Sequence, residues 1–89
     1  MNPLKVYVSV TTVFDQKGRM YPKQIHWPDG RVFDVDRVFD VRPAASLKVG
    51  GQGDRYTIQV RGRQSYLYFE KTSDDRNVNF GRWFVEAKH

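Results

Sequence analysis

Between residues 55 and 70, apolar and polar side chains alternate on both sides of a single glycine, a pattern that predicts a β-hairpin. Successive side chains of a strand point to opposite faces. One face of the first strand therefore carries three apolar residues, Tyr56, Ile58 and Val60. For the same face, the second strand offers one of two pairs, either Leu67 with Phe69 or Tyr66 with Tyr68.

The position of the turn decides between these pairs. A two-residue type II′ turn on Gly62–Arg63 pairs Val60 with Ser65, Ile58 with Leu67 and Tyr56 with Phe69. A two-residue turn on Arg61–Gly62 keeps the same faces, whereas a three-residue loop over 61–63 brings the two tyrosines inward. We favour a two-residue turn over the three-residue loop, because it buries side chains that have no hydroxyl group to satisfy.

This register leaves an aromatic, polar and basic surface on the outer face of the hairpin. We expect six residues to be candidate contacts: Arg55, Gln59, Arg61, Arg63, Tyr66 and Tyr68. Arginines hold phosphates and tyrosines stack on bases, so the surface suits single-stranded nucleic acid; a peptide is the other ligand that fits. The alternative is that these tyrosines are ordinary strand residues with high β-propensity.

Period-two alternation recurs in four other segments, which gives six predicted strands in all: Leu4–Phe14, Met20–Trp27, Arg31–Arg42 and Arg82–Ala87 join the two hairpin strands. Turns are expected at residues 15–18 and 27–30, where glycine follows aspartate. A bulge near Asp36–Arg37 would bend the long third strand and turn Val38 inward. Residues 44–48 have room for one helical turn, and residues 71–81 are expected to form a polar loop.

The 89 residues form one domain, 1–89. Very short connections favour an antiparallel all-β fold, a small barrel or roll of about six strands, SH3-like or OB-like, with at most one short helical turn. Closure is favoured because it removes exposed strand edges. A roll of two sheets is the rival architecture.

Composition narrows the function further. The chain has no cysteine, which excludes disulfides, thiolate metal sites and a cysteine nucleophile. There is neither a secretory signal pattern nor an apolar run approaching the ~20 residues of a membrane helix, so we expect a cytoplasmic protein without membrane contact. The net charge of +5, with arginine supplying nine of the 15 basic residues, favours an acidic partner such as nucleic acid.

No motif for catalysis or cofactor binding is complete. His26 and Asp34 can form a pair in the hairpin, but no serine is placed as a nucleophile. Asp34, Asp36 and Asp40 lack the glycine-containing loop of a calcium site, and pairing with nearby arginines is the simpler interpretation. The glycines at 50–53 lack the lysine and the following helix of a phosphate-binding loop. We therefore expect no enzyme activity, no metal and no cofactor.

Three segments carry a resemblance: residues 25–31 (Ile-His-Trp-Pro-Asp-Gly-Arg), residues 50–56 (Gly-Gly-Gln-Gly-Asp-Arg-Tyr) and residues 81–86 (Gly-Arg-Trp-Phe-Val-Glu). Together they resemble small uncharacterised bacterial β-barrel proteins, over about two thirds of the chain from Tyr21 onward. The resemblance implies a barrel fold and a bacterial source, and it implies no activity.

The sequence thus predicts a non-catalytic binding module. Nucleic acid is the first partner expected, bound through the outer face of the central hairpin. The alternative is a module that binds another protein or itself, because a thin core with many aromatic residues suits a barrel that buries one face against a partner.

Overall fold

The fold is known from a computed structural model that describes residues 4–44, 52–71 and 81–87. This part of the chain contains seven strands and no helix. In chain order the strands are β1 (Leu4–Phe14), β2 (Met20–His26), β3 (Val32–Asp34), β4 (Arg37–Pro43), β5 (Gln52–Val60), β6 (Arg63–Lys71) and β7 (Gly81–Ala87).

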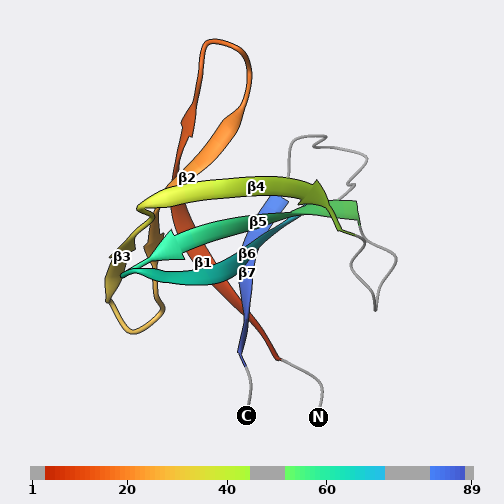
Figure 1. The fold of residues 1–89 in the computed structure, drawn as a ribbon. Coiled ribbons are helices and arrows are strands. Elements are labelled where there is room, and N and C mark those ends of the chain that lie inside the picture. Colours follow the sequence, from red (N-terminus) through yellow and green to blue (C-terminus); the bar gives the residue numbers. More distant parts are fainter. Residues whose placement is uncertain (1–3, 45–51, 72–80, 88–89) are drawn as a thin grey trace.

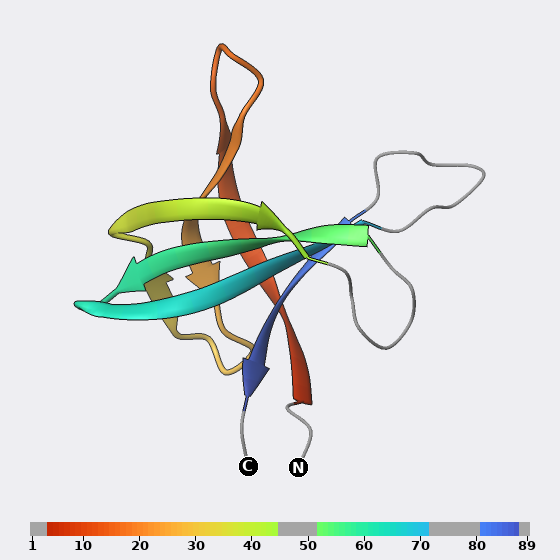
Figure 2. The ribbon, with the colours of Figure 1, turned by 45° about the vertical axis from the view of Figure 1, so that its right-hand side comes forward.

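All strand pairs are antiparallel, and the strands form one sheet in the order β3-β2-β1-β7-β6-β5-β4. The sheet curls into a half-barrel, with the β1–β2 hairpin extending beyond it (Figures 1 and 2). The prediction of a small antiparallel all-β, barrel-like fold is confirmed.

The seventh strand arises because the predicted third strand is divided by a bend. At the bend, the Val35 N–H donates to the Lys23 carbonyl (2.9 Å) and the Asp36 N–H donates to the Gln59 carbonyl (2.8 Å). The chain thus leaves the edge beside β2 and joins the edge beside β5 within two residues. Val38 then packs against the core opposite Ile58, as predicted, but the register shift lies between Val38 and Asp40 and not near Asp36–Arg37.

The concave face of the sheet holds the apolar core. Its buried members come from four strands and are joined by partly buried side chains such as Val8, Val38 and Val85: Ile25, Tyr56, Ile58, Leu67 and Trp83. Of the two tryptophans, Trp83 is therefore the core residue.

The faces of the central hairpin and its two-residue turn are as predicted, and the turn occupies Arg61–Gly62, one of the two predicted positions. The central residues are Arg61 and Gly62, with φ of 51° and 75°, so the turn is type I′ rather than type II′ on Gly62–Arg63. The pairs are accordingly Val60 with Arg63, Ile58 with Ser65 and Tyr56 with Leu67. The type I′ turn matches the right-handed twist of the strands, at the cost of placing an arginine in the left-handed region. Leu67 is fully buried, as either two-residue turn requires.

Of the other predicted elements, two turns lie in the described part of the chain, and two further segments lie mostly outside it. The turn at residues 27–30 is confirmed: the Gly30 N–H donates to the Trp27 carbonyl, Gly30 has φ of 96°, and Ile25 pairs with Phe33. The turn at residues 15–18 is confirmed by Gly18, with φ of 82°. The helical turn predicted at 44–48 and the polar loop predicted at 71–81 fall almost entirely outside the described residues.

We predict that Arg61→Asn stabilises the protein, because asparagine tolerates the left-handed region far better than arginine does. The free energy of unfolding should rise by about 0.5–1 kcal/mol. Chemical denaturation followed by tryptophan fluorescence measures this change. Arg61→Val is the opposite control, because a β-branched residue at positive φ should destabilise the hairpin; equal stability of the two variants would contradict the turn assignment.

Candidate binding site

The sheet has an incomplete seam between β6 and β7. The two strands pair only from Tyr68 to Lys71 on β6 and from Gly81 to Phe84 on β7. Residues 63–67 and 85–87 therefore extend past the last pair, and the two strands run apart there (Figures 1 and 2). The seam opens at the end of the molecule that carries the β5–β6 turn.

An apolar pocket of about 440 Å³ lies at this seam. Its lining comes from five strands and the β2–β3 turn, and most of it is aliphatic or aromatic: Ile25, Trp27, Phe33, Ile58, Val60, Ser65, Tyr66, Tyr68, Val85 and Glu86. Ile25 and Ile58 belong to the core, so the pocket gives an outside molecule access to the interior of the half-barrel.

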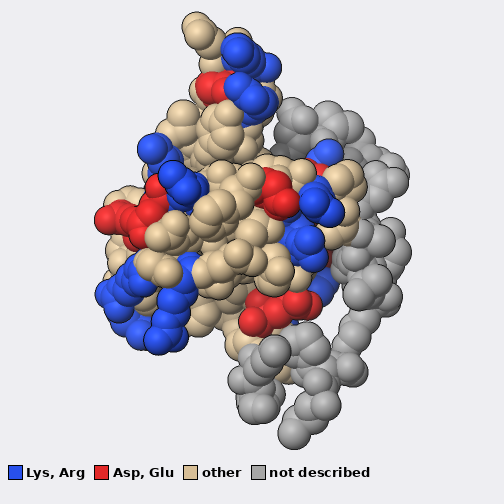
Figure 3. Space-filling model, in the orientation of Figure 1, with Lys and Arg blue, Asp and Glu red and all other residues tan. Residues whose placement is uncertain are grey.

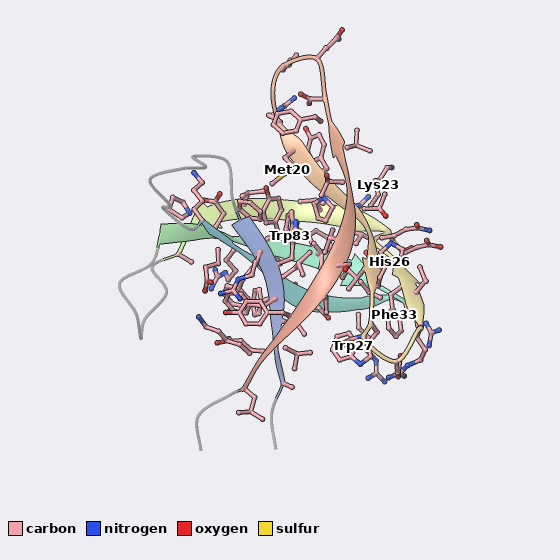
Figure 4. All side chains as sticks on the ribbon, turned by 180° about the vertical axis from the view of Figure 1, so that it is seen from behind. Met20, Lys23, His26, Trp27, Phe33 and Trp83 are labelled. Carbon is pink, nitrogen blue, oxygen red and sulfur yellow. The ribbon has the colours of Figure 1, made fainter. Side chains whose placement is uncertain are left out.

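Two aromatic rings from the β2–β3 hairpin form one wall. Trp27 and Phe33 meet edge to face, with ring centroids 6.3 Å apart and planes at 89°. They lie side by side at the β2–β3 turn, well apart from Trp83 in the core (Figure 4). Both rings are only half-buried, because the seam leaves them without a facing strand.

Arginines surround the turn end of the pocket. The guanidinium carbons of Arg31 and Arg61 lie 5.6 and 5.0 Å from the centroid of Phe33. Arg63 is two residues before Ser65 on β6 and so shares the strand face that lines the pocket. Basic side chains gather at this end of the molecule (Figure 3).

These arginines differ in their partners. Arg31 forms a salt bridge with Asp29 through Nε, at 2.7 Å. Neither Arg61 nor Arg63 has a salt bridge to any residue that the structure describes. Their charges are therefore available to an acidic ligand.

The backbone at the seam also has free hydrogen-bonding groups. In a two-residue hairpin the residues flanking the turn, here Val60 and Arg63, form a hydrogen-bonded pair, and such pairs alternate with non-hydrogen-bonded ones. Gln64 and Tyr66 are therefore directed away from β5, toward the seam. Among the described strands none pairs with this side of residues 63–67. The seam thus presents an open strand edge next to an apolar pocket.

The six predicted contact residues fall into three groups. Tyr66 and Tyr68 line the pocket, while Arg61 and Arg63 flank it. Arg55 lies behind Tyr66, with its guanidinium carbon 4.7 Å from the ring centroid. Gln59 is paired with Gln64 on one side and with Arg37 on the other, and it does not line the pocket. The outer tyrosines do face outward, but only Tyr66 is exposed, at 44%.

Aromatic rings on the outer face are largely engaged with neighbouring side chains. Tyr68 stacks on Phe84 with centroids 4.9 Å apart and planes at 5°, and Lys5 lies over the Phe84 ring. Burial raises the pKa of the Tyr68 hydroxyl, and the carboxylate of Glu86 raises it further. Tyr68 therefore stays a neutral hydrogen-bonding group at the wall of the pocket.

Glu70 joins three strands on the same outer face. Its carboxylate accepts from Lys5 Nζ at 2.9 Å and from Arg82 at 3.2 Å, and the Tyr7 hydroxyl lies 3.4 Å away. The side chain is only 11% exposed. Lys5 and Arg82 hold the pKa of Glu70 below its ordinary value, with Lys5 contributing most. This ion cluster links β1 and β7 to β6 at the point where the seam begins.

The candidate catalytic and metal-ligating residues His26, Asp34 and Asp40 have other partners in the structure. The His26 ring bonds to the Thr11 hydroxyl at 2.8 Å, and Asp34 accepts from the Gln24 amide at 3.0 Å, so the predicted His26–Asp34 pair does not exist. Asp40 pairs with Arg42 at 3.2 Å. No group of three or more metal-ligating side chains occurs in residues 4–44, 52–71 and 81–87. Nor does this part of the chain include a helix long and apolar enough to cross a membrane.

The predicted contact residues left out most of the pocket lining; four that the sequence did not place at the site or its rim are Trp27, Phe33, Arg31 and Glu86. The sequence did contain a clue to Trp27 and Phe33. The tight turn at 27–30 places Trp27 at the end of one strand of a hairpin, and Phe33 lies on the other strand. No sequence signal indicated Glu86, since its role depends on where β7 parts from β6.

No protein-family model matches the chain, and the searches of curated proteins and of solved structures found no match either.

We predict that Glu70→Gln destabilises the protein at neutral pH and not at low pH. A carboxylate whose folded pKa is depressed contributes stability above its unfolded pKa of about 4.3, and the contribution disappears as the pH falls through the folded value. The loss at pH 7 should be about 1–2 kcal/mol, as for hydrogen bonds between charged groups. Urea denaturation at several pH values measures it.

The matched control for this measurement is Asp36→Asn. Asp36 is exposed and has no salt bridge among the described residues, so this variant should change stability little at either pH. A Glu70→Gln loss that persists undiminished at pH 2.5 would contradict the electrostatic interpretation.

Proposed function

We propose that this protein is a non-catalytic binding module that captures an extended peptide segment of a partner protein at the seam between β6 and β7. The main observation behind this proposal is that an open strand edge, at residues 63–67, lies next to an apolar pocket that reaches the core. The guest segment adds a strand to β6, and one of its side chains enters the pocket. This is the strand-addition mode of peptide recognition.

Both parts of the seam are needed for such binding. The backbone groups of Gln64 and Tyr66 offer up to four hydrogen bonds, each worth about 0.5–1.5 kcal/mol net. Burial of one large apolar side chain in the pocket adds about 1.5–3 kcal/mol. Ordering an extended segment costs about 2–5 kcal/mol, which offsets most of either contribution, so net affinity depends on having both. The edge provides affinity for any extended chain, and the pocket selects the side chain.

We predict that peptides selected from a displayed random library depend on the pocket. Ser65→Phe places a large ring into the pocket from its own wall and should weaken the selected peptides by about 10- to 150-fold, the equivalent of one lost apolar side chain. Fluorescence anisotropy with labelled peptides measures this. Ser9→Phe, at an exposed serine of β1 that does not line the pocket, is the matched control and should bind as the native protein does.

The edge is tested separately by Gln64→Pro. Proline is tolerated where a strand N–H faces away from its partner, so the fold should persist, while a hydrogen bond to the guest is lost. Amide NMR shifts on peptide addition should centre on Gln64, Tyr66 and Val85. A library that yields no binders, or binders indifferent to both Ser65→Phe and Gln64→Pro, would overturn the proposal.

Single-stranded nucleic acid is a second candidate ligand. The observations that favour it are two arginines that form no salt bridge with any described residue, Arg61 and Arg63, and the exposed ring of Tyr66. Arginines would hold phosphates, while Tyr66 and Trp27 stack on bases at about 1–3 kcal/mol each.

We predict, for this candidate, that oligothymidylate binds at 50 mM salt and weakens steeply by 200 mM. The double variant Arg61→Asn/Arg63→Gln should reduce the slope of log affinity against log salt by about 1.4, or roughly 0.7 for each lost phosphate contact. Titration by anisotropy at several salt concentrations gives the slope. No binding at 50 mM salt, or binding without salt dependence, would rule nucleic acid out.

A further inference from the structure

We infer that the guest segment at the seam carries one large apolar side chain and, two residues away on the side of the β5–β6 turn, an acidic side chain. This inference rests on the proposed function and names its ligand class: an extended peptide that alternates apolar and acidic residues. It follows from the order of side chains along the free edge of β6 and from the distribution of charge around the pocket.

The two-residue spacing comes from strand geometry. Ser65 lines the pocket and Arg63 lies two residues nearer the turn on the same face of β6. Residues two apart on a strand lie about 6.5–7 Å from each other and point to one side. A guest strand paired with β6 has the same repeat. If one guest side chain enters the pocket beside Ser65, the guest residue two positions along faces Arg63.

Charge sets the chemistry of that second residue. Arg63 and Arg61 have no salt bridge with any described residue, whereas Arg31 is already bound to Asp29. Arg61 lies over Phe33, a wall of the pocket, and therefore borders the position that the acidic group would take. A carboxylate there gains two cationic partners.

The opposite end of the pocket carries a negative charge instead of a positive one. Glu86 lines the pocket from β7, on the side where the two strands meet. An acidic guest residue at that end would face a like charge. The pocket therefore favours an acidic residue on one side of the apolar anchor, which gives the guest a direction along β6.

Four labelled eight-residue peptides test the inference. Three of them contain one leucine within a threonine background. Aspartate stands two residues before the leucine in the first and two residues after it in the second, and the third has asparagine at both positions. The fourth has the better-placed aspartate and alanine instead of leucine. Binding is measured by anisotropy at 50 and 500 mM salt.

We expect one aspartate order to bind about three- to tenfold more tightly than the asparagine peptide at low salt, the range of a solvent-exposed charge pair. The other order should gain nothing, because it meets Glu86. The advantage should shrink at 500 mM salt, and the alanine peptide should lose most of its binding.

Variants separate local charge from net charge. Arg61→Asn/Arg63→Gln should abolish the preference, so that the aspartate and asparagine peptides bind this variant equally. Arg19→Gln/Arg42→Gln lowers the net charge by the same two units at arginines that do not line the pocket, and it should keep the preference. Glu86→Gln should raise the second aspartate order only to the affinity of the asparagine peptide, because that order still lacks the two arginine partners.

The outcomes distinguish the inference from the proposed function. If the aspartate and asparagine peptides bind equally and both are weakened by Ser65→Phe, the proposed function stands and the acidic preference is wrong. If the remote arginine pair abolishes the preference, the local assignment is wrong. If no peptide binds while oligothymidylate does, both the inference and the peptide function are overturned.

Discussion

One continuous run of backbone, from β3 through the bend to β4, belongs to both edges of the sheet. Val35 is hydrogen-bonded to β2 and the next residue, Asp36, is hydrogen-bonded to β5. The two outermost strands of a seven-stranded sheet are thus tied within two residues of each other. A flat sheet cannot satisfy this constraint, so the sheet must curl around its apolar face. The curl creates an interior for a chain that has no helix in its described part to cover that face.

The same constraint accounts for the place of the seam. Tying the bend to Gln59 brings the β2–β3 hairpin beside the β5–β6 turn, and this places Arg61 over Phe33. β6 follows β5 toward that turn, while β7 follows β1 in another direction, so their pairing ends at Tyr68 and Phe84. Where they part, no strand in the described part of the chain pairs with this edge of β6. The pocket is therefore a product of the way the half-barrel bends, and its lining comes from strands that are distant in sequence.

The two faces of the sheet near the seam have different interactions. The inner face is apolar and ends in the pocket. The outer face is a layer of rings and charges that satisfy one another, with Tyr68 on Phe84, Arg55 on Tyr66, and Lys5 and Arg82 on Glu70. Rings stacked in this way have less free surface for a ligand than an isolated exposed ring. For this reason we place the ligand at the seam and not across the outer face.

The alternation of apolar residues was enough to predict the turns at 15–18 and 27–30, the inward face of the central hairpin and the strands, except that the third is divided into β3 and β4, because strand faces follow a strict period of two. It did not distinguish a turn on Arg61–Gly62 from one on Gly62–Arg63, since both give the same faces; backbone twist decided that. Nor did it reveal the pocket. This pocket forms where β6 and β7 stop pairing. The place where they stop depends on how the sheet curls, and the bend at Val35–Asp36, which joins the two edges of the sheet, sets the curl. Local pattern therefore determined the elements, whereas the open edge, the arginine rim and the role of Glu86 exist only once the sheet has curled.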